Sequence, residues 1–197
     1  MTKKVKNVAR LRIISGEFGG RLIKAPEGRT THPMGDRVRS ALFNMIDVQG
    51  KTVLDAYAGS GAIGLEAISR GAEIVDFVEN DKQAQKVIEN NIDSLNVKSR
   101  AKLYKMGIGT FLNVQKDNKY DVVFVDPPYK NFKELSDGSV DFSTALKLKS
   151  LVKLNGLMVV SYKAGLCVPT VNGVVVVDNR NYGDAALLVL SFVPEHH

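Results

Sequence analysis

The chain has 197 residues, of which 44% are hydrophobic and 24% charged, so its length and composition are those of one globular domain with an ordinary core. No apolar run is long enough to cross a membrane and the first residues lack a hydrophobic signal core, so we expect a cytoplasmic protein with no membrane partner. The single cysteine, Cys167, excludes a disulfide framework and a thiolate metal site, and we expect no bound metal.

The net charge of +6 is concentrated near the N-terminus. Residues 1–50 hold ten lysines and arginines against four acids, whereas the rest of the chain holds 17 of each sign. A basic front on a neutral body is typical of a segment that binds a polyanion. We therefore expect two parts: a basic extension over residues 1–50 and a second domain over residues 51–193.

The extension is predicted to contain a hairpin and a helix. Residues 10–14 and 21–24 have strand character and flank a glycine-rich connection, which is typical of a β-hairpin. After a loop with two prolines, Asp36 is placed to cap a helix that runs to about Ile46, whose apolar residues keep helical spacing.

From Lys51 onward, strand and helix patterns alternate. Strands are predicted at 52–56, 73–79, 101–104, 120–125 and 157–162, with helices at 61–70, 82–95, 108–116 and within 141–153. Apolar strands joined by helices predict a parallel sheet covered on both faces. The last two strands, 174–178 and 185–192, are separated only by a polar turn at 179–184, so we expect an antiparallel hairpin added to that sheet.

A glycine loop follows the first of these strands. Gly59, Gly61 and Gly64 form the spacing G-x-G-x-x-G between a strand and a helix, which is typical of a nucleotide-cofactor loop and occurs in NAD enzymes too. Asp55 at the end of the strand discriminates between cofactors, because a carboxylate there repels a pyrophosphate and suits the amino group of S-adenosylmethionine. Glu79, which closes the second strand, can accept both ribose hydroxyls of either cofactor.

The fourth strand ends in Asp126-Pro127-Pro128-Tyr129. Open parallel sheets bind ligands at this edge. The two prolines fix an extended backbone and remove two N–H donors, which leaves the Asp126 carboxylate and the Pro127 carbonyl as acceptors. Two fixed acceptors can take both hydrogens of a base amino group, and Tyr129 offers a flat face for a base that has left its stack. The motif therefore predicts methylation of an exocyclic amino nitrogen.

The two motifs, in this order behind a basic hairpin and helix, resemble the bacterial 16S rRNA guanine-N2 methyltransferase family. The resemblance covers nearly the whole chain and is carried by residues 12–16, 20–21, 36–44, 54–72, 77–79 and 126–129. It implies an α/β fold of the class I, Rossmann-like methyltransferases, with a mostly parallel seven-stranded sheet, an antiparallel C-terminal hairpin and a small N-terminal β-hairpin and helix. The extension over residues 1–50 would then bind RNA.

Motifs, charge and resemblance together assign the site. Catalysis is expected from Asp126, Pro127 and Tyr129. The cofactor, S-adenosylmethionine, is expected to contact Asp55, Tyr57, Gly59, Ser60, Gly61, Glu79, Met106 and Gly107. The substrate, 16S rRNA within the small ribosomal subunit or an assembly intermediate, is expected to contact Arg10, Arg12, Arg21, Arg37, Arg39 and Pro128.

Two other functions stay open from the sequence. An adenine-N6 methyltransferase acting on DNA or RNA would use Asp-Pro-Pro-Tyr equally well, although no separate target-recognition domain for DNA is evident. The second is a cofactor-binding rRNA assembly factor whose methylation is incidental. An assay of methyl transfer to purified subunits separates these possibilities.

Overall fold

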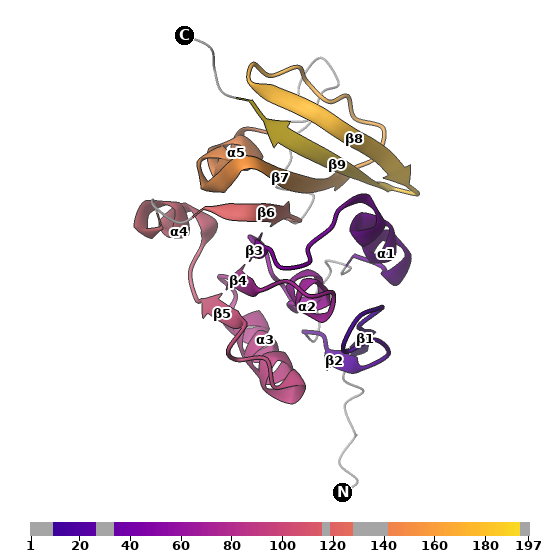
Figure 1. Cartoon of the computed structure of the whole chain (residues 1–197), viewed down its shortest axis with the longest axis vertical. Coiled ribbons are helices and arrows are strands. Elements are labelled where there is room, and N and C mark those ends of the chain that lie inside the picture. Colours follow the sequence, from indigo (N-terminus) through magenta and orange to yellow (C-terminus); the bar gives the residue numbers. More distant parts are fainter. Residues whose placement is uncertain (1–9, 27–33, 116–118, 128–141, 194–197) are drawn as a thin grey trace, which may run out of the picture.

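A computed structural model describes residues 10–26, 34–115, 119–127 and 142–193 of the chain. Its centre is a seven-stranded sheet in the order β5-β4-β3-β6-β7-β9-β8 (Figure 1). The strands are β3 (Thr52–Asp55), β4 (Ile74–Val78), β5 (Ala101–Tyr104), β6 (Tyr120–Val125), β7 (Val152–Lys163), β8 (Val174–Tyr182) and β9 (Ala185–Phe192). Strands β3 to β7 pair in parallel, and β9 runs antiparallel to both of its neighbours, β7 and β8. The predicted fold class is confirmed.

Helices cover both faces of the sheet, because its strands send apolar side chains alternately to either side. Val122 and Phe124 of β6 enter one core cluster, and Val123 and Val125 enter the other. The first cluster is covered by α1 (Asp36–Met45), α2 (Ala62–Ser69) and α3 (Lys82–Leu95). The second is covered by α4 (Ile108–Val114), α5 (Ser143–Lys147) and a 3₁₀ turn (Leu148–Leu151).

The N-terminal hairpin packs on the first face. It consists of β1 (Arg10–Arg12) and β2 (Leu22–Lys24), which pair antiparallel. Its buried residues Ile13, Phe18 and Ile23 belong to the same core cluster as Val53 of β3. The side chain of Asn91 on α3 ties down β2, since it accepts from Lys24 N–H at 2.8 Å and donates to Lys24 O at 2.9 Å. The extension and the sheet therefore share one hydrophobic core.

The structure differs from the sequence prediction at the start of α1. The helix is capped by Gly35, and Asp36 is its first residue with no side-chain capping bond. The Asp36 carboxylate instead accepts from Arg39 Nη2 at 3.0 Å, one turn along the helix. An ion pair with a neighbouring arginine has therefore replaced the predicted cap.

The C-terminal half also differs, because two strands are longer than predicted. Strand β7 begins at Val152, where it pairs with Tyr120 before a shift of register. Strand β8 continues to Tyr182 through polar residues that were predicted to form a turn, since each of them pairs with the apolar strand β9. The turn contains only Gly183 and Asp184, and Gly183 supplies the positive φ of 67° that a two-residue hairpin turn needs.

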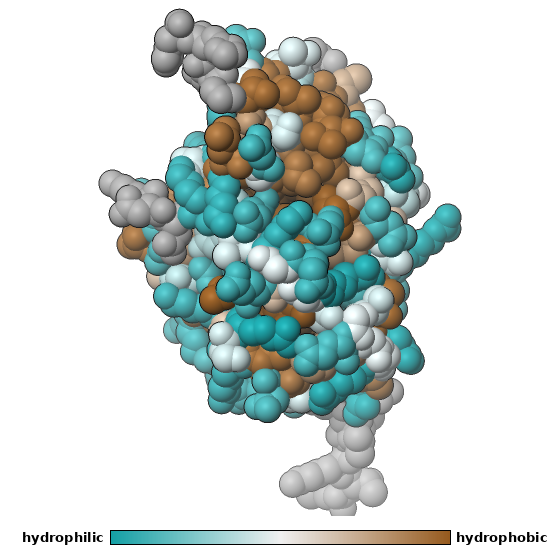
Figure 2. All heavy atoms as spheres, in the orientation of Figure 1, coloured by the Kyte–Doolittle hydropathy of each residue, from teal (hydrophilic) through white to brown (hydrophobic). Residues whose placement is uncertain are grey.

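The two hairpins give the molecule different surfaces. Figure 2 shows apolar side chains gathered over the C-terminal hairpin, where Val175, Val176 and Val177 of β8 are exposed. The N-terminal hairpin, toward the other end of the view, exposes Arg10 and Arg12 on β1. Among the described residues, none of the helices has the length and apolar character needed to cross a membrane.

Candidate active site

The candidate site lies where the parallel strands β3, β4 and β6 end. Asp55 is the last residue of β3 and pairs in register with Phe77 of β4 and Phe124 of β6. Glu79 follows β4 and Asp126 follows β6. The sheet topology thus brings three carboxylates that are far apart in the sequence to one edge, as the sequence predicted for a cofactor at the carboxyl ends of parallel strands.

The glycine loop between β3 and α2 is shaped by backbone conformations that favour glycine. Gly59 and Gly61 have positive φ angles of 56° and 79°, and Gly61 caps the N-terminus of α2. Gly64 lies so close to β4 that an added Cβ would come within 2.2 Å of a Phe77 ring carbon. The Gly59 N–H donates to Glu79 Oε2 at 2.8 Å, so the loop is tied to the neighbouring strand.

Asp55 is a buried acid with an incomplete set of donors. Only 1% of the residue is exposed, its Oδ2 accepts from the Gly64 N–H at 3.0 Å, and its Oδ1 has no hydrogen-bond partner within the described part of the chain. Burial raises the pKa of Asp55 to about 7, and the charges of Asp126 and Glu79 raise it further, against the lowering effect of the backbone amides of Gly64 and Tyr57. A ligand that brings a cation and an N–H donor would satisfy this oxygen.

Asp126 lies half-buried at the end of β6, and Pro127 beside it is buried. Burial raises the pKa of Asp126 to about 6, and a hydrogen bond with Ser161 opposes that rise. Pro127 has no N–H, so the backbone after Asp126 adds no donor at that position. Pro128 and Tyr129, the remaining residues of the motif, lie outside the described residues.

The remaining predicted cofactor residues lie along the same edge of the sheet. Tyr57 in the glycine loop is half-buried, and burial raises the pKa of its phenol. Ser60 is buried, and its carbonyl accepts from Asn91 Nδ2 at 3.0 Å. Met106 and Gly107 follow β5, with Gly107 as the N-cap of α4 near Asn80. The structure thus brings together along this edge the residues expected to contact the cofactor.

Comparison with known proteins shows the family. The family model described as Conserved hypothetical protein 95 matches residues 11–191. The chain belongs to the Conserved hypothetical protein 95 family. One curated relative, Ribosomal RNA small subunit methyltransferase D of Escherichia coli (strain K12), is 37% identical over 125 residues. That match covers 61% of this chain and 61% of the relative, less than two thirds of its length.

Solved structures agree with the observed topology. The Escherichia coli protein yhhF has a TM-score of 0.77 and 28% identity, and the match covers 93% of this chain and 98% of that chain. SMU.776, solved in complex with SAH, has a TM-score of 0.71 at 16% identity, over 96% of this chain and 57% of that chain. This member of the Conserved hypothetical protein 95 family therefore has the fold of S-adenosylmethionine-dependent methyltransferases.

The arginines predicted to bind substrate fall into two groups. Arg10, Arg12, Arg21 and Arg37 are exposed or partly exposed. Arg39 is fully buried, where it donates to the Arg12 carbonyl and to Asp36 and lies 3.9 Å from Glu66 Oε2. Its position supports a structural role rather than contact with RNA, because its guanidinium is enclosed by protein. The sequence grouped it with the other arginines because all of them belong to the basic N-terminal segment.

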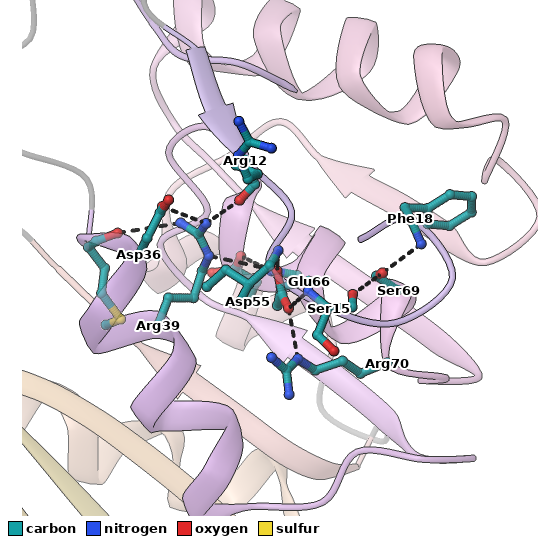
Figure 3. A network of polar contacts seen from close by, with 12 residues as sticks. Arg12, Ser15, Phe18, Asp36, Arg39, Asp55, Glu66, Ser69 and Arg70 are labelled. Carbon is teal, nitrogen blue, oxygen red and sulfur yellow. Dashed lines mark hydrogen bonds and ion pairs between the residues drawn. The ribbon is translucent and has the colours of Figure 1, made fainter. Parts of the chain in front are cut away.

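The network around Arg39 also contains residues that sequence reasoning missed (Figure 3). Glu66 is fully buried in α2, and its carboxylate accepts from Ile14 N–H at 2.7 Å, Ser15 N–H at 3.0 Å and Arg70 Nε at 2.7 Å. Ser69, one turn later, accepts from Phe18 N–H at 2.9 Å. The sequence held one signal for this role: an acid in the middle of an otherwise apolar helix needs buried donors.

Proposed function

We propose that this chain transfers a methyl group from S-adenosylmethionine to the N2 amino group of a guanine in 16S rRNA of the small ribosomal subunit. The observation that carries the proposal is the meeting, at one edge of the sheet, of Asp55 with its unpartnered buried oxygen and the Asp126-Pro127 corner. The name of the Escherichia coli relative and the basic N-terminal hairpin support an rRNA substrate.

The residues present fit the cofactor. S-adenosylmethionine would supply an electrophilic methyl group on a sulfonium centre. Asp55 Oδ1 would accept a hydrogen bond from its ammonium group, and that cation would relieve the repulsion among three neighbouring acids. Glu79 accepts from the Gly59 and Asp81 amides, and its carboxylate would also accept from ribose hydroxyls. The other proposed contacts are Tyr57, Gly59, Ser60, Gly61, Met106 and Gly107.

Asp126 is proposed to hold the reacting nitrogen. Because its pKa is about 6, the carboxylate is mostly ionised at pH 7.5 and acts as an acceptor. Together with the Pro127 carbonyl it would fix the amino group and localise the nitrogen lone pair, while Tyr129 would stack on the base. The N–C bond would form as the C–S bond breaks, and the amino group would then release one proton. Much of the acceleration would come from proximity and orientation.

The test of the substrate is nucleoside mass mapping of 16S rRNA from cells that lack this protein, with and without a plasmid copy. We expect one N2-methylguanosine to disappear and to return with the wild-type copy. Loss of an N6-methyladenosine would establish the adenine alternative instead. An unchanged set of modified nucleosides together with defective subunit assembly would establish the assembly-factor alternative.

The test of the site is single-turnover methyl transfer to small subunits by two Asp126 variants. Asp126→Ala removes the acceptor and should lose about 3 kcal/mol of transition-state stabilisation, or roughly a hundredfold in rate. Asp126→Asn keeps one oxygen acceptor and should retain measurable turnover. Cofactor affinity should stay close to wild type in both. A wild-type rate for Asp126→Ala would remove Asp126 from the proposed site, and equal complete loss in both variants would indicate a proton-accepting carboxylate.

A further inference from the structure

Ser161 lies near the end of β7, beside the predicted catalytic corner. Val160 pairs in parallel with Val125, the last residue of β6, so the next residues along the two strands, Ser161 and Asp126, are neighbours at the carboxyl edge of the sheet. Only 3% of Ser161 is exposed. A buried hydroxyl in an apolar stretch of strand needs a hydrogen-bond partner, and the Asp126 carboxylate provides one.

The alternation of side chains places Ser161 on the face of the sheet that carries the site. Val159 of β7, Phe124 of β6 and Val53 of β3 all enter the first core cluster. Two residues beyond each of them lie Ser161, Asp126 and Asp55, which share that face because side chains two apart in a strand point to the same side. Ser161 therefore approaches Asp126 on the side of the sheet where Asp55 and the glycine loop lie.

We propose that Ser161 is a positioning residue for methyl transfer, which holds the Asp126 carboxylate so that one oxygen stays directed at the amino group of the base. The inference rests on the proposed function of Asp126. A serine hydroxyl has one donor, so it can occupy a single lone pair of the carboxylate and leave the other acceptor sites free. Without that bond, the carboxylate of a half-buried residue at the end of a strand can rotate, and the acceptor loses its fixed direction.

The same hydrogen bond favours the ionised form of the acceptor. It lowers the pKa of Asp126 against the effect of burial, so its loss should raise that pKa further above the ordinary value. The other charged groups near this edge are Asp55 on β3, whose charge interacts with that of Asp126, Glu79 after β4, and the exposed Lys163 on β7. None of these changes in a Ser161 variant, so a shift in the pH profile reports the missing hydroxyl.

The experiment compares Ser161→Ala and Ser161→Thr with wild type and with Asp126→Ala. Ser161→Ala should lower kcat roughly tenfold at pH 7, the effect of one hydrogen bond to a charged group, with KM and cofactor affinity unchanged. The acidic limb of its pH–rate profile should move to higher pH. Ser161→Thr keeps the hydroxyl on a residue suited to a strand and should retain the wild-type kcat and the wild-type pH–rate profile. Ser191→Ala, at the far end of the neighbouring strand β9, is the matched control and should behave as wild type.

A second readout does not depend on activity. Titration of the Asp126 carboxyl carbon by ¹³C NMR in the protein without cofactor should show a higher midpoint in Ser161→Ala than in wild type. Wild-type kcat and an unmoved midpoint in Ser161→Ala would overturn the inference, and so would an equal loss at every pH accompanied by weaker folding. If those results came with a large loss in Asp126→Ala, only the role of Ser161 would fail. A wild-type rate for Asp126→Ala would instead remove the proposed function.

Discussion

Two buried acids of this molecule, Glu66 within α2 and Asp55 at the end of β3, have different surroundings. Glu66 has no exposed surface and accepts from two backbone amides and one arginine, with Arg39 close by. Asp55 is 1% exposed, its Oδ1 has no hydrogen-bond partner among the described residues, and it interacts with the charges of two other acids. A buried carboxylate whose oxygens accept hydrogen bonds from the protein thus holds the hairpin against α2. A buried carboxylate with an oxygen that accepts none can instead accept from a ligand.

The largest expected effect is the loss of stability on removal of Glu66. Glu66→Ala removes one of the two acids beside the buried Arg39 and leaves the amides of Ile14 and Ser15 without their acceptor, so we expect a loss of about 3–5 kcal/mol in the free energy of unfolding. Urea denaturation measures it. Asp55→Asn is the matched control and should not lower stability at pH 8. A loss below about 1 kcal/mol in Glu66→Ala would mean that the network does not hold the extension.

The converse change tests whether Asp55 is reserved for the cofactor. Asp55→Ala should weaken the binding of S-adenosylhomocysteine by about 1–3 kcal/mol, because a charge-assisted hydrogen bond is removed. Calorimetry measures this, and NAD should show no binding to either protein. The control is Asp76→Asn. Asp76 is a buried acid on β4 that accepts from the Tyr120 hydroxyl at 2.6 Å, and its variant should bind S-adenosylhomocysteine as the wild type does. Tight NAD binding, with none for S-adenosylhomocysteine, would reject the cofactor assignment.

The pH dependence of folding should report the ionisation of Asp55. Since the folded pKa of Asp55 is about 7 and its ordinary value is 3.8, the folded state binds more protons than the unfolded state between these values. Stability of the cofactor-free protein should therefore fall as pH rises from about 4 to about 7, by at most about 1.4 kcal/mol per pH unit for this group. Asp126 contributes with the same sign up to about pH 6.

Asp55→Asn should flatten that fall in stability, and the cofactor should bind more tightly as pH rises through the same window because it selects the ionised form. Unfolding curves at pH 5, 6, 7 and 8 measure the first effect, and calorimetry at the same values measures the second. Identical slopes in wild type and Asp55→Asn would mean that Asp55 is not the group that titrates.

A weaker effect should distinguish the outer arginines of the extension from the inner one. Neutralising Arg10, Arg12 and Arg21 should reduce the salt dependence of rRNA binding, by a slope of roughly 0.7 to 0.9 for each phosphate that is no longer neutralised. Cofactor affinity and stability should hardly change, since these side chains lie at the surface. Arg39→Met, in contrast, should alter stability and leave the slope alone. An unchanged slope in the triple variant would make the outer face of the extension structural too.

Local patterns predicted most of this fold because the decisive residues are close in sequence. Helix α3 has its predicted bounds, since Asp81 caps it by accepting from the Gln83 and Ala84 amides and Asn96 ends it with a φ of 59°. The same holds for β6, a continuous apolar run between polar neighbours. Periodicity and capping chemistry were sufficient there.

The sequence failed to predict features that depend on partners far away in the chain. The polar end of β8 is a strand because the apolar strand β9 pairs with it, and no local property of residues 179–182 shows this. Arg39 is enclosed by partners that include the Arg12 carbonyl, 27 positions earlier, and Glu66, 27 positions later, in addition to its neighbour Asp36. The candidate site was found through motifs, but Ser161 was not, since a serine in an apolar strand becomes informative only when the register sets it beside Asp126.

The hydrogen bonds that hold the extension have a consequence for synthesis of the chain. The hairpin is synthesised before α2 and α3, yet its amides bond to Glu66 and Ser69, and its second strand bonds to Asn91. At about 5–20 residues per second, those partners follow several seconds later. During that interval the basic hairpin lacks the partners that hold it in the folded chain. Vectorial synthesis therefore means that the hairpin can dock in its final position only after α2 and α3 have been made.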